Sequence, residues 1–445
     1  QVRGRLDRSL ADARVRLDAA RAALDAATAW CAAVTAGRDP LAARLPPDPK
    51  LAGQVIDTGD VLVVAGTDRA DSVRVARDPA TGGLIVTVDG VPRYVRPGTR
   101  LIVRTGAGDD RVVVDPDVTA GVTVLAGAGD DRVTGGSGDD LLAGLGGDDV
   151  IHGRSGRDRV TAGAGRDYVD GGAGSDAVRG GAGDDTAYGL SGDDRLDGGA
   201  GVDYLDGGRG DDRLIGGADG DALTGGRGRD DVRGGAGDDY LYGGDDADIL
   251  TGGAGGDVAY AQADDVRAGV ERDVDVALTA ADAVRVRGTA DFVERVGSDL
   301  DTLRSSPVGG RMLDALRVDG APVTVTATPD ANGYAIARGG VFGAPGVDVE
   351  FNPEFQAVAG GPPVTVLFHE LAHAYDLLHD TYAPGVYTGP DDGRVNNMER
   401  EAVGLPVDHD GDPTTPPRSF PGHPDELTEN ALRAELGVPP RQRYG

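Results

Sequence analysis

The sequence predicts a multidomain protein with an N-terminal helix, a β-rich segment, a long array of short repeated strands and a C-terminal α+β domain. Three observations support this prediction. The first 37 residues are rich in Ala, Leu and Arg, which favour helix. A nine-residue period rich in Gly and Asp recurs through the middle of the chain. From about residue 289 onward, helical and strand patterns alternate without that period.

The bulk composition limits the classes of partner. The 445 residues include 74 Gly and 75 acidic side chains but only 6 Phe and 1 Trp, so part of the chain is not built around an ordinary core. A net charge of −31 argues against nucleic acid or an anionic membrane as a partner, because phosphates would be repelled. No apolar run reaches about 18 residues, so we expect no membrane span.

Cysteine usage and the N-terminus bear on where the protein works. Cys31 is the single cysteine, so an intrachain disulfide cannot form and a secreted chain would need another staple, for which metal is the obvious choice. The N-terminus is charged and shows no apolar leader, so we expect that export, if it occurs, uses another signal or that the numbering begins after a signal was lost.

Residues 1–45 are predicted to form a helical segment followed by a linker. Apolar residues from Leu6 to Val34 are spaced alternately four and three apart, as in a heptad seam. The simplest interpretation is one long helix that packs on a neighbour or on a second copy of the chain. A dimeric coiled coil through residues 6–34 and an export-related helix are the alternatives. Prolines from Pro40 to Pro49 mark the linker.

Residues 54–125 are predicted to form a β-rich cap. Stretches such as DVLVVAG and GGLIVTVDG alternate apolar and polar residues between Gly, Asp and Pro clusters, which is typical of short strands. The sequence TGAGDDRVV at 105–113 is already a first copy of the repeat that follows.

Residues 126–260 form an unbroken array of fifteen nine-residue units, for example GGSGDDLLA at 135–143. The glycines permit tight turns, and the eighth position is Val, Leu or Ile in all but two units, which can stack in a narrow core. The sixth position is always Asp, and a carboxylate is a hard oxygen ligand for Ca²⁺. The predicted calcium ligands are therefore Asp131, Asp140, Asp149, Asp158, Asp167, Asp176, Asp185, Asp194, Asp203, Asp212, Asp221, Asp230, Asp239, Asp248 and Asp257.

This array resembles the RTX-type calcium-binding nonapeptide. The resemblance implies a parallel β-roll with two units per turn and Ca²⁺ held between successive turns. With 29 Asp, no Glu and 12 Arg, the array should repel itself and stay unfolded until Ca²⁺ binds. The alternative interpretation, a Gly/Asp-rich linker, does not account for a period of nine kept through fifteen copies.

The domain at 289–445 contains HELAH within the amphipathic stretch 363–379. His369 and His373 lie four residues apart and so share one helix face, with Glu370 beside the first. This spacing is typical of a zinc site in which two imidazoles hold the metal and the glutamate handles the proton of a metal-bound water. The remaining histidines are not tied to the motif by spacing and are expected at the surface: His152, His379, His409 and His423.

A catalytic zinc needs a third protein ligand and one open position. The short helical stretch NNMEREAVGLP at 396–406 offers Glu399, our first choice, and Glu401, the alternative; both could equally be solvated helix carboxylates. The strand VDVEFNP just before the motif is predicted to be an edge to which an extended substrate adds. The oxyanion contact stays unassigned among Tyr375, Tyr382, Tyr387 and Arg433.

The same domain resembles the NleD-like effector metallopeptidases, found among proteins that bacteria inject into host cells. The matching pieces are FNP at 351–353, PPVTVLFHELAHAYD, RVNNMEREAVGLP, and TENALRAELGVPPRQRY at 428–444. The resemblance implies a zincin-like metallopeptidase with His369 and His373 as zinc ligands, Glu370 as general base and Glu399 as third ligand. It does not carry over a substrate, because substrate choice depends on loops outside these motifs.

These features predict a secreted calcium-dependent zinc endopeptidase that acts on a protein or peptide substrate. One alternative is an effector or toxin protease with a narrow target, delivered into another cell. The other is a calcium-binding β-roll scaffold or adhesin with an inactive protease-like domain, although the three motif residues are all present.

Overall fold

The computed structural model describes residues 55–57, 61–278, 284–317, 322–328, 334–338, 346–352, 362–379, 427–438 and 440–441. The chain divides into two compact units, Gln1–Gly183 and Asp184–Gly445. The predicted N-terminal helix lies outside the described residues, so the structure gives no support to coiled-coil association through residues 6–34.

The described strands of the first unit form two sheets, in the orders β1-β2-β6-β8-β10-β12-β14 and β13-β11-β9-β7-β3-β4-β5. Only β1, β4 and β5 pair in antiparallel fashion; the other pairs are parallel, which confirms the predicted β-roll. Parallel pairing already begins at β2 and β3, well before residue 126. The strands are β1 (Val55–Asp57), β2 (Val61–Ala65), β3 (Ser72–Arg77), β4 (Leu84–Val88), β5 (Val91–Val95), β6 (Arg100–Ala107), β7 (Arg111–Val114), β8 (Val122–Ala128), β9 (Arg132–Thr134), β10 (Leu141–Gly146), β11 (Val150–His152), β12 (Arg159–Ala164), β13 (Tyr168–Ala173) and β14 (Ala177–Ala182).

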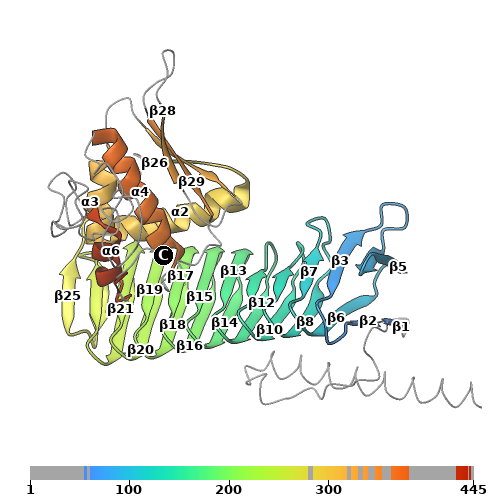
Figure 1. The fold of residues 1–445 in the computed structure, drawn as a ribbon. Coiled ribbons are helices and arrows are strands. Elements are labelled where there is room, and N and C mark those ends of the chain that lie inside the picture. Colours follow the sequence, from blue (N-terminus) through green and yellow to red (C-terminus); the bar gives the residue numbers. More distant parts are fainter. Residues whose placement is uncertain are drawn as a thin grey trace, which may run out of the picture. The chain divides into compact units, whose positions relative to one another are not determined.

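The second unit begins with further parallel strands, in the orders β16-β18-β20-β22-β24 and β25-β23-β21-β19-β17-β15 (Figure 1). Leu196 pairs with Leu214, and Leu205 with Leu223, so each residue faces the one 18 positions later. Two nonapeptides therefore make one turn. The strands are β15 (Thr186–Ser191), β16 (Arg195–Ala200), β17 (Tyr204–Arg209), β18 (Arg213–Ala218), β19 (Ala222–Arg227), β20 (Asp231–Ala236), β21 (Tyr240–Asp245), β22 (Ile249–Ala254), β23 (Val258–Ala261), β24 (Val266–Ala268) and β25 (Arg272–Asp275).

Each nonapeptide supplies a strand and a turn for a physical reason. The eighth-position side chains of neighbouring turns, such as Leu205, Leu223 and Leu241, are fully buried and stack between the two sheets. The turn that precedes Leu205 needs a positive φ, as at Gly201 (φ 126°), which an L-residue adopts at a cost. The repeat thus alternates a short buried strand with a glycine turn.

The C-terminal part of the second unit combines helices with a four-stranded sheet in the order β26-β27-β29-β28. Its strands are β26 (Val284–Arg287), β27 (Val323–Ala327), β28 (Tyr334–Arg338) and β29 (Gly346–Phe351), and its helices are α2 (Ala290–Ser305), α3 (Pro307–Ala315), α4 (Pro363–His379) and α6 (Glu429–Glu435). The prediction that VDVEFNP is an edge is wrong: β29 pairs with β27 on one side and β28 on the other. Strand β28, which pairs with β29, is the edge strand on that side of the described sheet.

Helix α2 packs on the outer face of β15, β17, β19 and β21, which we call the docking face (Figure 1). At its centre the guanidinium of Arg295 lies 3.2 Å from the ring centroid of Tyr188 and 2.9 Å from the carboxylate of Asp299. Next to this pair, Ser298 donates to Asp206 at 2.7 Å. All five side chains are buried, so the contact is a polar network within a closed interface.

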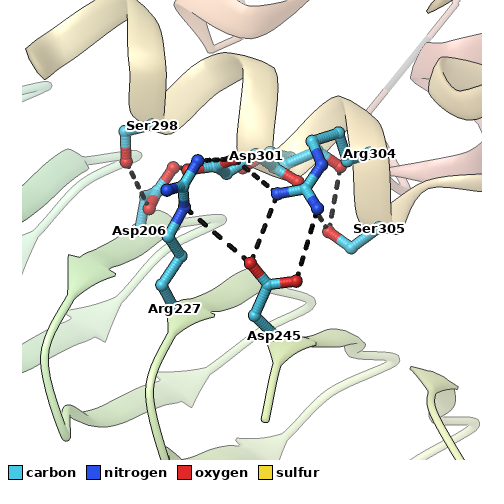
Figure 2. Close-up of polar contacts among 8 residues, drawn as sticks. Asp206, Arg227, Asp245, Ser298, Asp301, Arg304 and Ser305 are labelled. Atoms are coloured by element: carbon cyan, nitrogen blue, oxygen red, sulfur yellow. Dashed lines mark hydrogen bonds and ion pairs between the residues drawn. The ribbon is translucent and has the colours of Figure 1, made fainter. Parts of the chain in front are cut away.

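The edge of this interface is an ion-pair network (Figure 2). Arg227 donates two hydrogen bonds to Asp301, at 2.7 and 2.9 Å, in the two-pronged geometry that guanidinium and carboxylate favour. Arg304 contacts the same carboxylate at 2.9 Å and reaches Asp245 at 3.3 Å. Because Arg227 and Asp245 belong to the roll and the other two to α2, the network fixes the helix on the docking face.

Asp206 makes the docking face sensitive to pH. The pKa of Asp206 is raised to about 7, chiefly by burial and also by the nearby Asp299, while the hydrogen bond from Ser298 and the charge of Arg295 act in the opposite direction. A folded-state pKa above the unfolded value of about 3.9 means that the native state binds more protons in this range. Its stabilising contribution is therefore complete below about pH 4 and is lost as pH rises through 7.

We expect Asp206→Asn to remove this loss, since the neutral amide keeps the shape and can still accept from Ser298. In excess Ca²⁺, the stability of the variant relative to wild type, measured by urea unfolding, should grow by about 1–3 kcal/mol between pH 5 and pH 8. Asp231→Asn, a partly exposed carboxylate in β20, is the matched control and should show no such trend. A difference in the free energy of unfolding between the Asp206 variant and wild type that stays the same at pH 5 and pH 8 would contradict the assignment.

Candidate functional site

Helix α4 places the HELAH motif inside the C-terminal part of the second unit. The helix begins after Pro362, whose carbonyl accepts from both the backbone N–H and the hydroxyl of Thr365. It contacts β28, β29 and α6. His369, Glu370 and His373 are 3%, 5% and 6% exposed, so the motif lies in the interior and not on a solvated helix face.

The two histidines converge through their Nε2 atoms, which lie 3.1 Å apart, with the rings at 84° to each other. Two imidazoles bound to one zinc at 2.0–2.1 Å with a tetrahedral angle would place their nitrogens roughly 3.3 Å apart. The pair therefore fits a shared metal ion with little rearrangement. Glu370 follows His369 directly on the same helix, where the predicted general base belongs.

A third side chain, Glu429 at the start of α6, contacts the other nitrogen of the first histidine. Its Oε2 lies 3.1 Å from Nδ1 of His369. The same carboxylate contacts Arg433 at 3.2 Å and Arg441 at 3.3 Å, and it is 1% exposed. Burial alone would raise the pKa of Glu429, but the hydrogen bond from His369 and the charges of both arginines hold it below its usual value.

Sequence reasoning did not single out Glu429 as a site residue. Two signals pointed to it: Glu429 and Arg433 have the i,i+4 spacing of a helical ion pair, and both fall in the TENALRAELG motif. Arg433 itself, considered for the oxyanion, is fully buried and pairs with Glu429 on the Nδ1 side of His369. The ring of Tyr375 stacks on His379, with centroids 4.2 Å apart.

The third zinc ligand is not found in the described part of the chain. No group of three or more His, Cys, Asp or Glu side chains with metal-holding geometry occurs among the described residues. Glu399 and Glu401 lie outside them, as do Tyr382, Tyr387, His409 and His423. Of the remaining histidines, His379 is exposed, and His152 lies 3.6 Å from Asp170 in the roll.

The second candidate site is the row of sixth-position aspartates, which we call the aspartate ladder. In every case described, Oδ1 accepts the backbone N–H of the residue one turn earlier: Asp149 from Asp131 at 2.8 Å, and Asp221 from Asp203 at 2.9 Å. All fifteen predicted aspartates are buried, at 3% exposure or less. The structure thus places every predicted calcium ligand in the aspartate ladder.

The second carboxylate oxygen of the ladder aspartates, Oδ2, has an unusual environment. In most members of the ladder Oδ2 is buried and accepts no hydrogen bond from the described residues, which is costly for a carboxylate. These members are Asp131, Asp149, Asp158, Asp203, Asp212, Asp221, Asp230, Asp239, Asp248 and Asp257. Except for Asp131, whose unit begins with Ala126, each of these Oδ2 atoms lies against the first-position glycine of its own unit; a Cβ at Gly216 would collide with Asp221.

Burial raises the pKa of the ladder carboxylates far above the ordinary value. Like charges on neighbouring turns contribute to the increase at most of these positions. The pKa reaches about 8 for Asp149, Asp158, Asp221, Asp230 and Asp248, about 7 for Asp131, Asp167, Asp203 and Asp212, and about 6 for Asp140, Asp176 and Asp239. Buried carboxylates of one sign need a counter-charge, and oxygen atoms beside backbone carbonyls fit Ca²⁺.

The ladder extends beyond the fifteen predicted residues. At its start, Asp110 accepts from the N–H of Asp71 at 2.7 Å and itself donates to Asp131. At its end, Asp265 accepts from Asp248, and Glu271 takes the place of an aspartate for Asp257. Asp110 is the sixth residue of TGAGDDRVV, so the sequence held a signal for it; the others stand outside the nine-residue period.

Comparison with known families finds two matching family models. Residues 280–444 match the family model of Peptidase_M91, effector protein. Six stretches between residues 123 and 259 match the RTX calcium-binding nonapeptide repeat, so the predicted order of repeats first and effector peptidase second is confirmed. No curated protein matches the chain.

The two matches indicate a calcium-binding effector protein with a peptidase-family domain, and they support secretion. No helix in the described part of the chain is long and apolar enough to cross a membrane.

The ladder predicts that calcium and protons compete for the same carboxylates. Because the buried aspartates hold protons up to pH 6–8, Ca²⁺ should bind more tightly at pH 8 than at pH 6. A chelator should abolish the β signal in circular dichroism at pH 8, and Ca²⁺ should restore it.

A matched pair of variants in the second unit isolates the ladder. Asp221→Asn removes a buried ladder charge and should weaken calcium-induced folding, while Asp231→Asn removes a partly exposed charge and should leave the calcium midpoint unchanged. A β signal indifferent to chelation, or equal midpoints for the two variants, would be incompatible with the ladder as the calcium site.

Proposed function

We propose that the protein is a secreted, calcium-dependent zinc endopeptidase. The observation that carries the proposal is the convergence of the His369 and His373 Nε2 atoms at 3.1 Å within a buried helix. The Peptidase_M91 match over residues 280–444 supports peptide hydrolysis, and the RTX match supports the calcium requirement. Zinc is the metal we assign, because two imidazoles and a glutamate form a common zinc ligand set.

The residues of the chain would divide the work as follows. His369 and His373 hold zinc, and Glu399 supplies the third protein ligand, with Glu401 as the alternative. When bound, zinc polarises the scissile carbonyl and makes a water molecule more acidic. Glu370 takes a proton from the attacking water on its carboxylate and delivers it to the leaving amine. Burial of the motif keeps competing bulk water away from this proton transfer.

Substrate binding is assigned to the edge of the four-stranded sheet. Strand β28 is an edge of the described sheet and contacts α4, so an extended peptide that pairs with it would run beside the motif. Backbone pairing of this kind recognises an extended chain and not a particular side chain. The substrate class is therefore an unfolded or loop segment of a protein.

An effector or toxin protease with one narrow target is the second candidate, and the effector-family match favours it. Both candidates use the same chemistry, and cleavage of unfolded casein separates them: a broad endopeptidase cleaves casein, and a narrow one does not. A scaffold or adhesin with an inactive domain is the third candidate. The complete HELAH motif and the close approach of its two histidines argue against it.

The general base gives the first test. We expect Glu370→Gln to lower peptide hydrolysis by about 10²–10⁴-fold while zinc content stays near one per chain, because proton transfer is lost and the metal ligands remain. Zinc is measured by mass spectrometry and hydrolysis with casein or a peptide library. Asp314→Asn, an exposed carboxylate on α3, is the control and should retain wild-type activity. Wild-type turnover by the Glu370 variant would refute the assignment.

The third ligand gives the second test. We expect Glu399→Ala to lose zinc to a chelator far more readily than wild type, and Glu401→Ala to retain it, since a missing ligand lowers affinity directly. Competition with a coloured chelator measures both. The reverse order would assign the role to Glu401, and two variants that both bind zinc normally would exclude residues 396–406 as the source of the ligand.

A further inference from the structure

The carboxylate of Glu429 occupies an arrangement that the proposed hydrolysis does not use directly. It is 1% exposed and faces three donors: Nδ1 of His369 at 3.1 Å, Arg433 at 3.2 Å and Arg441 at 3.3 Å. We propose that Glu429 is a positioning residue that holds His369 with its proton on Nδ1 and its Nε2 lone pair directed at the shared metal position. The inference rests on the proposed zinc site.

The chemistry of imidazole explains why such a partner matters. A neutral ring carries one proton, and a metal can bind only the nitrogen that lacks it. A carboxylate on Nδ1 keeps the proton there, fixes the ring plane and makes Nε2 a stronger donor to the metal. The distance between the Nε2 atoms of His369 and His373, 3.1 Å, shows that the ring is already turned in this direction.

Arg433 and Arg441 both pair with the carboxylate of Glu429. Arg433 is fully buried and pairs with Oε1, while Arg441 pairs with Oε2, the oxygen that His369 also contacts. Both guanidinium groups contact this one buried carboxylate, and together they hold it facing Nδ1 of His369 at 3.1 Å. A plain ion pair between α4 and α6 would need only one cation.

The position of Glu429 is set by the elements that hold α6. The hydroxyl of Tyr242 in β21 donates to the carbonyl of Glu435 at 3.1 Å, and the Glu435 carboxylate accepts from the backbone N–H of Val308 at 2.9 Å. Gly437, just past the helix, packs so closely on the ring of Tyr240 that a Cβ would collide with it. Strand β21 of the roll thus anchors the helix whose first residue orients His369.

The test compares two buried glutamates of the same helix. We expect Glu429→Gln to lower zinc affinity by about 10–100-fold in competition with a chelator, and to change the visible spectrum of the Co²⁺-substituted protein. Glu435→Gln keeps a side-chain oxygen that can accept from the Val308 N–H and so preserves the anchor of α6. Because it does not alter the contact with His369, it should leave zinc affinity within about twofold. Thermal unfolding in Ca²⁺ is measured for both, because a purely structural role would lower stability in the two variants without separating their zinc affinities.

Several outcomes decide the matter. Zinc affinity of Glu429→Gln equal to wild type, with reduced thermal stability, would reduce Glu429 to a structural ion pair. If the variant does not fold, wild-type protein labelled with ¹⁵N-histidine and loaded with ¹¹³Cd provides the second measurement: coupling of the metal to Nε2 of His369 supports the proposal, and coupling to Nδ1 overturns it. Absence of zinc from the wild-type protein would instead refute the proposed function.

Discussion

The buried row of like-charged carboxylates is the constraint on which the rest of the structure depends. Each nonapeptide of the roll buries an aspartate whose Oδ1 accepts a hydrogen bond from the neighbouring turn and whose Oδ2, in most units, lies against a glycine. Aliphatic stacking of residues such as Leu205 and Leu223 favours closing the roll, but burying charges of one sign opposes it. Only a cation or a proton resolves the conflict, so the fold of the roll is tied to the calcium concentration around it.

That dependence extends to the peptidase-family domain. Helix α2 buries Arg295 and Asp299 against Tyr188 of the roll, and these groups would be left without the tyrosine if the docking face did not form. Helix α6 likewise takes its anchor from Tyr242. The roll strands of the second unit are therefore part of the packing of this domain. A calcium requirement of the proposed hydrolysis would then arise from packing.

Sequence alone predicted what is encoded locally and missed what depends on distant contacts. The period of nine predicted the parallel roll and its buried aspartates, and helical spacing placed His369 and His373 on one face. The edge strand was misjudged because the pairing of β28 with β29 depends on a distant segment. The partner of His369 was missed because Glu429 lies 60 residues away and a glutamate at a helix start has many uses.

A second signal, of period 18, was present but overlooked. Alternate units carry Tyr188, Tyr204 and Tyr242 on the face covered by α2, whereas the opposite sheet carries Arg195, Arg213 and Arg233 at equivalent positions.

Because alternate units belong to opposite sheets, the repeat number of such a chain can change freely only in pairs. Inserting one nonapeptide between Tyr188 and Asp206 would place these residues on opposite sides of the roll and divide the surface that receives α2. Inserting two would keep both on the same side and only move them apart by about 4.8 Å, one strand spacing. Gain and loss of repeats in steps of 18 residues is thus the route by which a roll carrying a domain on one side can lengthen or shorten without losing it.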